Sequence, residues 1–230
     1  MVNQMVKIPK GCVLWLDLTE DTGDIIYDRS RHGNNSKVYG AVLEKRLPYV
    51  GRRFDGVDDY AVVSDSPSLR CETNNELTVL AWVKLEYLDA PRFENFVLRK
   101  STDWNNGWGL SWFRGEDTMG FRLVFTDGSS VTLKTKRPDE WVFVGGTYDG
   151  SKAYLYKNAT IVTTKEVNKT IEDTTGYPVY ISKSDRLIKG FVAHVSIYNR
   201  ALSPREIKYL YEEFQKRVFR RIAPLEIRMR

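Results

Sequence analysis

Short apolar runs separated by turn residues, at intervals of roughly ten, are the feature that most constrains the fold of this chain. The runs at 13–18, 77–84 and 141–148 are rich in β-branched and aromatic residues, which favour strands. Two Asp-Gly pairs, at 127–128 and 149–150, can supply the positive φ of tight hairpin turns and predict antiparallel pairing. The pattern predicts an all-β sandwich or barrel and excludes a helical or parallel α/β body.

The individual strands can be placed from these runs. They are expected at 13–18, 60–63, 77–84, 95–99, 108–113, 119–125, 131–134, 141–148, 152–156, 160–165, 179–181 and 191–198. Large aromatic side chains at Phe54, Trp82 and Trp141 are expected to fill the space between two sheets.

One helix is predicted near the C-terminus. Ser203 is its N-cap, Pro204 opens the first turn, and Glu206 stands three residues after the cap. The apolar residues that follow on one face are Ile207, Leu210, Tyr211, Phe214 and Val218. We therefore expect a helix from Ser203 to about Val218 that packs this face against the sandwich.

Charge is distributed unevenly along the chain. The whole chain has 35 Lys+Arg and 30 Asp+Glu, and residues 215–230 hold six of the basic and one of the acidic residues. Residues 1–214 balance at 29 of each sign, so they create no overall field that would attract nucleic acid. No repeat or linker interrupts them, which predicts one domain over 1–214, including most of the helix. A basic C-terminal extension over 215–230 is expected to act as a linker or subunit contact.

Two further features bear on the protein's setting. No apolar stretch approaches the roughly 20 residues of a membrane helix, and residues 1–7 lack the apolar core of a signal peptide. Cys12 and Cys71 lie too far apart for a metal knuckle, so zinc-site spacing is absent and free thiols are favoured over a disulfide.

Several segments resemble the motifs of a known family. They are 14–18 (LWLDL), 28–34 (DRSRHGN), 54–60 (FDGVDDY), 77–84 (LTVLAWVK), 141–150 (WVFVGGTYDG) and 197–207 (IYNRALSPREI). In this order, across about residues 13–214, they resemble the LamG-like jelly-roll domains of the concanavalin A-like lectin/glucanase superfamily. The resemblance implies an antiparallel two-sheet jelly-roll sandwich, with the first strand near the last, followed by the C-terminal helix.

The same resemblance implies a non-catalytic carbohydrate-binding or adhesion module that holds glycans or cell-surface polysaccharides at a loop rim. Balanced charge in residues 1–214 favours neutral or weakly charged glycans. The competing class is a protein–protein or particle-assembly module of a virion or an extracellular structure, without sugar binding. Either class implies an extracellular or virion-associated setting.

A glycoside hydrolase is the less favoured class. A retaining glycosidase needs two carboxyl groups about 5 Å apart, and no predicted strand carries acidic residues at alternating positions. A Ser-His-Asp or Cys-His nucleophile would need His32 or His194, and neither has a nucleophile motif nearby. We therefore expect no enzymatic activity.

Calcium is also implied by the resemblance, in a structural role on loops rich in Asp and Asn, whose hard oxygens suit the ion. Asp28, Asn34 and Asp58 are the ligands carried over by position. Asx turns and caps explain the same residues equally well. In addition, Ala193 and His194 stand where the family often has an Asp-Glu pair, which removes a further ligand.

The best local match to a sugar site is the loop around Trp104. A sugar ring packs its C–H face on an exposed aromatic side chain while polar groups bind its hydroxyls. Asp103, Asn105 and Asn106 surround Trp104, which predicts a ligand platform, although an aromatic folded over the edge of the core explains Trp104 as well. A second polar loop, 114–118, would add hydroxyl partners if it lies at the same rim.

Overall fold

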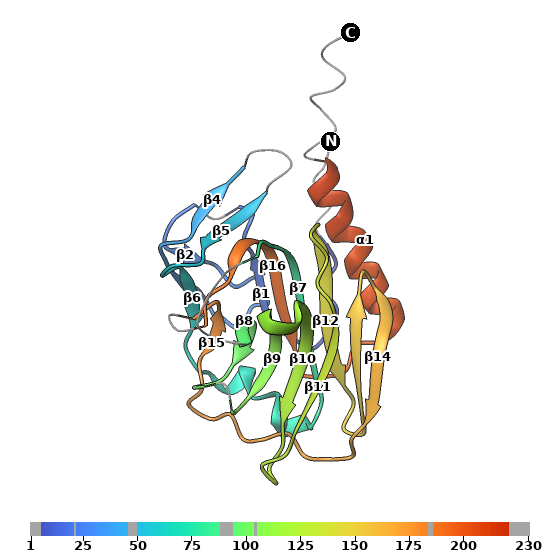
Figure 1. Cartoon of the computed structure of the whole chain (residues 1–230). Helices are drawn as coiled ribbons and strands as arrows, with labels where there is room; N and C mark the ends of the chain where they lie inside the picture. The colour runs from blue at the N-terminus through green and yellow to red at the C-terminus, as the bar shows by residue number, and fades with distance from the viewer. Residues whose placement is uncertain are drawn as a thin grey trace.

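Two antiparallel sheets packed face to face form the body of the protein, and one helix lies outside them (Figure 1). The computed structural model describes residues 6–20, 22–45, 50–87, 94–103, 105–183 and 186–220, with side chains described up to residue 216. Each sheet has eight strands within this part of the chain. The predicted two-sheet jelly-roll sandwich with one C-terminal helix is confirmed.

The first sheet, sheet A, has the order β14-β13-β12-β7-β16-β5-β4, with β1 also paired to β16. Its strands are β1 (Cys12–Asp17), β4 (Val42–Glu44), β5 (Gly51–Asp55), β7 (Leu77–Leu85), β12 (Val142–Tyr148), β13 (Lys152–Lys157), β14 (Thr160–Glu166) and β16 (Lys189–Tyr198). The pairing of β1 with β16 places the first strand beside the last, as expected.

The second sheet, sheet B, has the order β11-β10-β9-β8-β15-β6-β3-β2. Its strands are β2 (Ile25–Ile26), β3 (Ser36–Tyr39), β6 (Tyr60–Val63), β8 (Glu94–Lys100), β9 (Trp108–Phe113), β10 (Thr118–Val124), β11 (Ser130–Lys136) and β15 (Val179–Ile181). Short 3-10 turns lie at η1 (Pro67–Leu69), η2 (Cys71–Asn74) and η3 (Arg114–Glu116). The two Asp-Gly pairs join β10 to β11 and β12 to β13 as antiparallel hairpins, as predicted.

The main core fills the space between the sheets. Alternate residues of each strand point into it because successive side chains of a strand face opposite sides of the sheet. On sheet B these include Trp108, Leu110 and Trp112, which are at most 1% exposed. The residues between them, Gly109 and Ser111, consequently belong to the outer face of sheet B.

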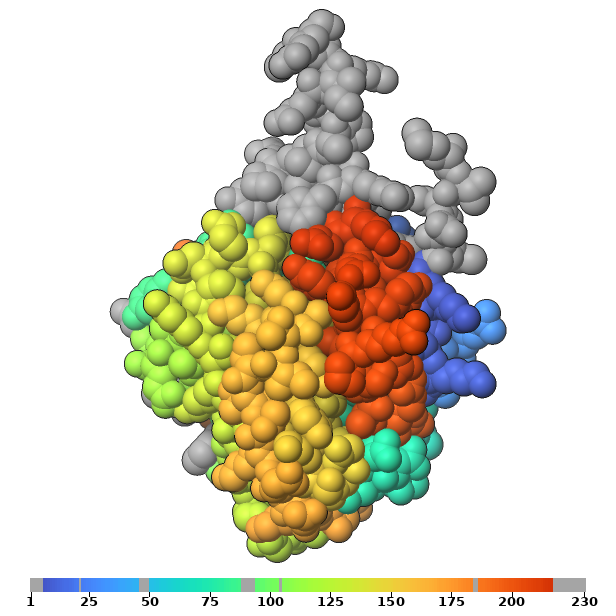
Figure 2. Space-filling view, turned by 90° about the vertical axis from the view of Figure 1, so that its right-hand side faces the viewer, coloured from blue at the N-terminus to red at the C-terminus, as the bar shows by residue number. Residues whose placement is uncertain are grey.

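A second, smaller core lies between the outer face of sheet A and helix α1 (Pro204–Arg220). Ile207, Leu210 and Phe214 of α1 are buried there, which confirms that the helix packs its apolar face on the sandwich. Figure 2 shows α1 lying lengthwise beside the β13–β14 hairpin.

Trp82 and Trp141 belong to this second core, so the expectation that they fill the space between the sheets is wrong. The reason is strand parity: Ala81 and Val83 point between the sheets, which turns Trp82 outward to the helix. Phe54 does lie in the core between the sheets, as predicted.

No helix in the described part of the chain is long and apolar enough to cross a membrane.

Candidate ligand-binding surface

The loop between β8 and β9, residues 101–107, contains the predicted sugar site. Asn106 Oδ1 accepts hydrogen bonds from the N–H groups of Thr102 (2.9 Å) and Asp103 (3.2 Å), and Asn106 Nδ2 donates to Thr102 Oγ1 (2.6 Å). Asp103 Oδ1 accepts from the N–H of Asn105 at 2.7 Å. Asp103 and Asn106 therefore organise the loop itself, while Asn105 is exposed. Trp104 lies outside the described residues, so its role as a ligand platform stays a prediction.

Two cationic side chains attach this loop to the outer face of sheet B. Arg99 Nη2 donates to the carbonyl oxygen of Asn106 at 2.7 Å, and Lys183 Nζ donates to that of Thr102 at 2.6 Å. The Lys183 ammonium also lies 5.6 Å from the ring centroid of Tyr180. The loop therefore forms one border of the outer face of sheet B.

The second polar loop, 114–118, does not lie at this rim. It follows β9, whereas residues 101–107 precede β9, so the two loops stand at opposite ends of this strand. A strand of six residues spans roughly 20 Å. Asp117 in the second loop instead accepts a hydrogen bond from Arg137 Nε at 2.6 Å.

Asp28 is the centre of a turn. Its Oδ1 accepts hydrogen bonds from the N–H groups of Trp15 and Ser30, both at 2.9 Å. Its Oδ2 accepts from Ser30 Oγ at 2.7 Å and from the N–H of Asn34 at 2.9 Å. These four bonds use the lone pairs that a calcium ion would need.

Asn34 is equally committed to the protein. Its Nδ2 donates to the carbonyl oxygen of Val13 (2.7 Å) and to Ser68 Oγ (2.9 Å), and its Oδ1 accepts from Ser66 Oγ at 2.7 Å. Asp28 and Asn34 thus fit the Asx-turn explanation better than the calcium explanation.

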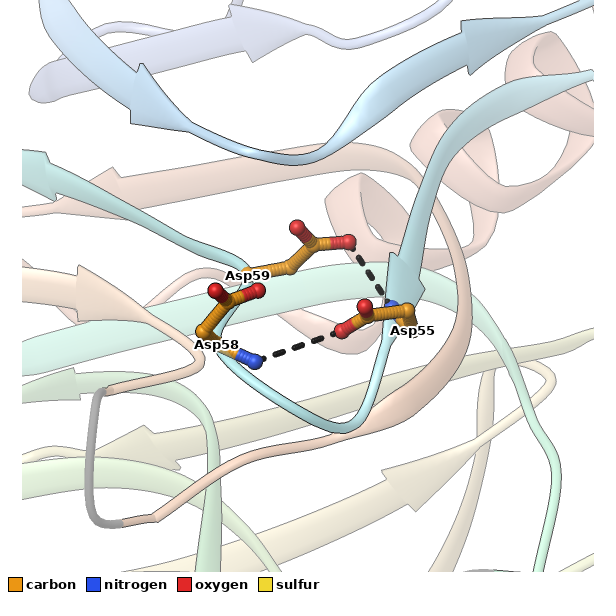
Figure 3. A group of neighbouring side chains, drawn as sticks. All are labelled: Asp55, Asp58 and Asp59. Carbon is orange, nitrogen blue, oxygen red and sulfur yellow. Dashed lines mark hydrogen bonds between the residues drawn. The ribbon is translucent and has the colours of Figure 1, made fainter.

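Asp58, the third predicted ligand, belongs to a different group. Asp55, Asp58 and Asp59 surround the turn between β5 and β6, and each offers a carboxylate oxygen within 4.8 Å of the others (Figure 3). The same turn uses two of these carboxylates, since Asp59 Oδ2 accepts from the N–H of Asp55 at 2.9 Å and Asp55 Oδ1 accepts from that of Val57 at 2.7 Å.

The pKa of Asp59 is raised, first by burial and then by the negative charges of Asp55 and Asp58. The carboxylate oxygens of this group are hard ligands, and a cation would relieve the repulsion between their negative charges. Three carboxylates, however, do not by themselves supply all of the six to eight oxygens that calcium takes. In its donor chemistry this group fits calcium better than Asp28 and Asn34 do.

Neither histidine is placed for nucleophilic catalysis. His32 is exposed in the turn after β2, whereas His194 is 2% exposed. The His194 ring packs between Trp15 and Phe214, at centroid distances of 4.4 and 3.9 Å. His194, at the position where the resemblance expects an acid, is therefore part of the core beneath α1.

The two cysteines are buried free thiols, as favoured from the sequence. Burial raises the pKa of the Cys12 thiol to about 12 and also raises that of Cys71. Both thiols stay protonated at neutral pH and make poor nucleophiles.

Two aromatic side chains meet on the outer face of sheet B along β3 and β6. Tyr39 and Tyr60 stand directly opposite each other on these strands, with ring centroids 4.5 Å apart and ring planes 13° apart. Tyr39 is 37% exposed and Tyr60 is half-buried, while Tyr27, which follows β2, is 57% exposed. Lys37 Nζ lies 5.0 Å from the centroid of the Tyr39 ring. The outer face therefore presents a stacked aromatic pair beside a cation.

The sequence prediction missed this pair because it contained no strand at 36–39. The evidence for this strand is a short alternation of buried and exposed residues: Ser36 and Val38 are buried while Lys37 and Tyr39 are exposed. Four residues among Gly, Asn and Ser are too few to distinguish a strand from a loop. Tyr60, by contrast, opens a strand that was predicted with its observed bounds.

The architecture defines the class: a jelly-roll sandwich, here with a partly exposed aromatic pair on the outer face of sheet B. Residues 55–208 match the Laminin_G_3 family model, and the chain belongs to the concanavalin A-like lectin/glucanases superfamily. Comparison with curated proteins by sequence finds no match.

Several binding domains of known structure share this fold. The binding domain of Paraclostridial Mosquitocidal Protein 1 has a TM-score of 0.70 and 18% identity, covering 89% of this chain and 52% of that one. The binding domain of Botulinum Neurotoxin DC in complex with SialylT has a TM-score of 0.69 and 15% identity, covering 90% and 52%. The botulinum neurotoxin serotype G binding domain has a TM-score of 0.69 and 13% identity, covering 88% and 51%. The chain thus spans about half the length of these structures, and the likeness is one of fold.

Proposed function

We propose that this protein is a non-catalytic glycan-binding module that holds its ligand on the outer face of sheet B, with the loop 101–107 as one border. The observation that carries the proposal is the partly exposed Tyr39–Tyr60 stack. An aromatic surface of this kind suits the C–H face of a sugar ring. Lys37, beside the Tyr39 ring, and Asn105, in the border loop, would bind the hydroxyl groups of the sugar.

Binding by one site would be weak, because a shallow site built around one pair of tyrosine rings removes little ligand surface from water. Useful adhesion would require several copies on one particle or cell surface. We accordingly place the module outside the cell or on a virion. Calcium, where it binds, would stabilise the β5–β6 turn through Asp55, Asp58 and Asp59 rather than touch the sugar.

A glycan array probed with the protein at high density, with and without calcium, tests this function. We expect binding to a defined set of glycans. Tyr39→Ala and Tyr60→Ala should each weaken it about tenfold, since an aromatic contact contributes on the order of 1 kcal/mol beyond its buried area. Tyr209→Ala, which removes an exposed tyrosine from α1, is the matched control and should leave binding unchanged.

Other outcomes would redirect the proposal. Loss of binding in Trp104→Ala, with Tyr39→Ala unaffected, would move the site to the loop rim. No hit at high density, together with oligomers that form as concentration rises, would favour the particle-assembly module instead.

A further inference from the structure

The pairing register of sheet B assembles a row of basic and aromatic side chains that the sequence disperses. Directly opposite residues on successive strands form one line across the sheet: Ile25, Lys37, Val62, Tyr180, Arg99, Gly109, Arg122 and Thr132. Three of these residues are cations and none is an acid. The expectation of neutral glycans depended on the balanced charge of residues 1–214, and a charge count does not show that Lys37 and Arg122 reach the surface of one sheet, with the buried Arg99 between them.

This row lies on the outer face of sheet B. Arg122 alternates with Phe121 and Leu123, which are buried between the sheets. Thr132 likewise alternates with Val131 and Leu133, which belong to the same core. Arg122 and Thr132 are both partly exposed.

Glu94 is the carboxylate that binds Arg99 within the described part of the chain, and it also binds Ser111. Arg99 is fully buried, and its Nη1 donates to Glu94 Oε1 at 2.5 Å. The same Glu94 oxygen accepts from Ser111 Oγ at 2.6 Å. Glu94 Oε1 is therefore shared by Arg99 and Ser111, and no hydrogen bond joins Glu94 to Arg122 among the described residues.

Arg122 has no carboxylate partner among the residues that the structure describes. The one hydrogen bond of its side chain within that part of the chain is a long one, from Nη1 to Thr132 Oγ1 at 3.4 Å, and its Nε is buried without a partner. Burial, and after it the nearby positive charges of Arg122 and Arg186, hold the pKa of Arg99 down at about 10 against the opposing effect of Glu94. The positive charge of Arg122 therefore acts unfavourably on Arg99, and an anion bound at Arg122 would reduce this effect.

The two ends of the face differ in charge. Asp55, Asp58 and Asp59 stand at the start of β6, beside the Tyr39–Tyr60 stack, whereas Arg122 lies on β10. Four strand spacings separate β6 from β10, which is roughly 19 Å. A ligand that covers both ends has the length of a short oligosaccharide, with its neutral part over the tyrosines and its acidic part over β10.

We propose that the outer face of sheet B binds a carboxylate-bearing glycan laid across the strands, with Arg122 and Thr132 receiving the carboxylate and Tyr39 and Tyr60 carrying a sugar ring. This inference rests on the proposed glycan-binding function and specifies the ligand class. A planar guanidinium bonds a carboxylate through two parallel N–H···O contacts, which gives it specificity as well as affinity.

Two copies of one glycan array test the ligand class, one untreated and one with every carboxylate converted to its methyl ester. We expect the signals of the untreated array to fall at least tenfold on the esterified copy, since each glycan there keeps its rings and loses its charge. Arg122→Gln should lose about tenfold in affinity for the acidic glycans, and Arg122→Lys should retain part of the binding. Lys165→Gln, which makes the same charge change on the exposed edge strand β14, is the matched control and should bind like the wild type.

The outcomes separate the two proposals. Equal signals on both copies, or an Arg122→Gln variant with an unchanged melting temperature and unchanged binding, would overturn the acidic ligand and leave glycan binding in place. Signals confined to sulfated glycans, which esterification leaves charged, would overturn the carboxylate. An array without any hit would remove the glycan-binding function and this inference with it.

Discussion

Asp28 shows at the scale of a residue what a motif can and cannot reveal. The segment 28–34 correctly indicates a structured loop, but a turn and a calcium site require the same residue types. Only the folded structure shows that both Asp28 oxygens are occupied by hydrogen bonds from Trp15, Ser30 and Asn34.

Asp28→Ala should lower the free energy of unfolding by about 2–3 kcal/mol, because it leaves main-chain donors without their charged acceptor. The cost should be the same in calcium and in EDTA. Asp28→Asn keeps one acceptor oxygen and should cost less. Chemical denaturation of the three proteins in both buffers measures the difference, and a cost that appears only with calcium would show that Asp28 is a metal ligand.

A buried arginine, Arg52, explains why β5 was not predicted from the sequence. Arg52 is 2% exposed, and its Nη1 and Nη2 donate to the carbonyl oxygens of Ala41 (2.8 Å) and Gly23 (2.5 Å). A run that begins Gly-Arg-Arg lacks the alternation of apolar and polar residues that marks a strand. An arginine is rarely buried, and the carbonyl groups that make burial of Arg52 possible lie far away in the sequence.

At the scale of an element, helix α1 was largely predictable because its signals are local. Ser203 Oγ accepts from the N–H of Glu206 at 3.3 Å, and Glu206 Oε2 accepts from that of Ser203 at 2.9 Å, as the capping motif predicts. The sequence did not show that Arg200 Nη2 also donates to Glu206 Oε1 at 2.6 Å.

Glu206→Gln tests this cap through its pH dependence. The Arg200 hydrogen bond, followed by those from Ser203, lowers the pKa of Glu206 from 4.5 to about 2. A lowered pKa in the folded state means that ionised Glu206 stabilises the fold above pH 4.5 and that this contribution is lost as the pH falls towards 2. After allowance for solvent screening, we expect Glu206→Gln to cost about 1–2 kcal/mol at pH 7.

The cost should shrink as the pH falls through this range, which thermal unfolding from pH 7 to pH 3 would follow. Glu212→Gln, on the exposed side of the same helix, is the control and should cost little at any pH. A Glu206→Gln deficit that does not change with pH would contradict the Arg200 contact.

The two halves of the C-terminal region should respond differently to mutation. Phe214 is 5% exposed and packs on Trp15, Phe143 and His194, so Phe214→Ala should cost about 3–4 kcal/mol of unfolding free energy by opening a cavity under α1.

Deletion of 219–230, most of which lies outside the described residues, should leave the fold intact. Melting temperatures compare the two changes, and a deletion that unfolds the protein would mean that the basic extension belongs to the core.

At the scale of the whole molecule, the sequence predicted the architecture far better than the binding surface. Strands such as β6, β9 and β15 have the predicted bounds because their apolar runs are bounded by turn residues. The candidate surface depends on register: Tyr39 meets Tyr60 once β3 pairs with β6, and Arg122 joins the row of Lys37 only once the six strands from β3 to β10 are paired. No local spacing encodes such an arrangement.

The central claim, that the outer face of sheet B is the ligand surface, is tested most directly by an amide NMR titration. The ¹⁵N-labelled protein would be titrated with the strongest glycan from the array. Concentration-dependent shifts are expected in β3, β6, β15 and β10, with α1 and β14 unchanged. Shifts confined to the loop 101–107, or to α1 and β14, would contradict the account.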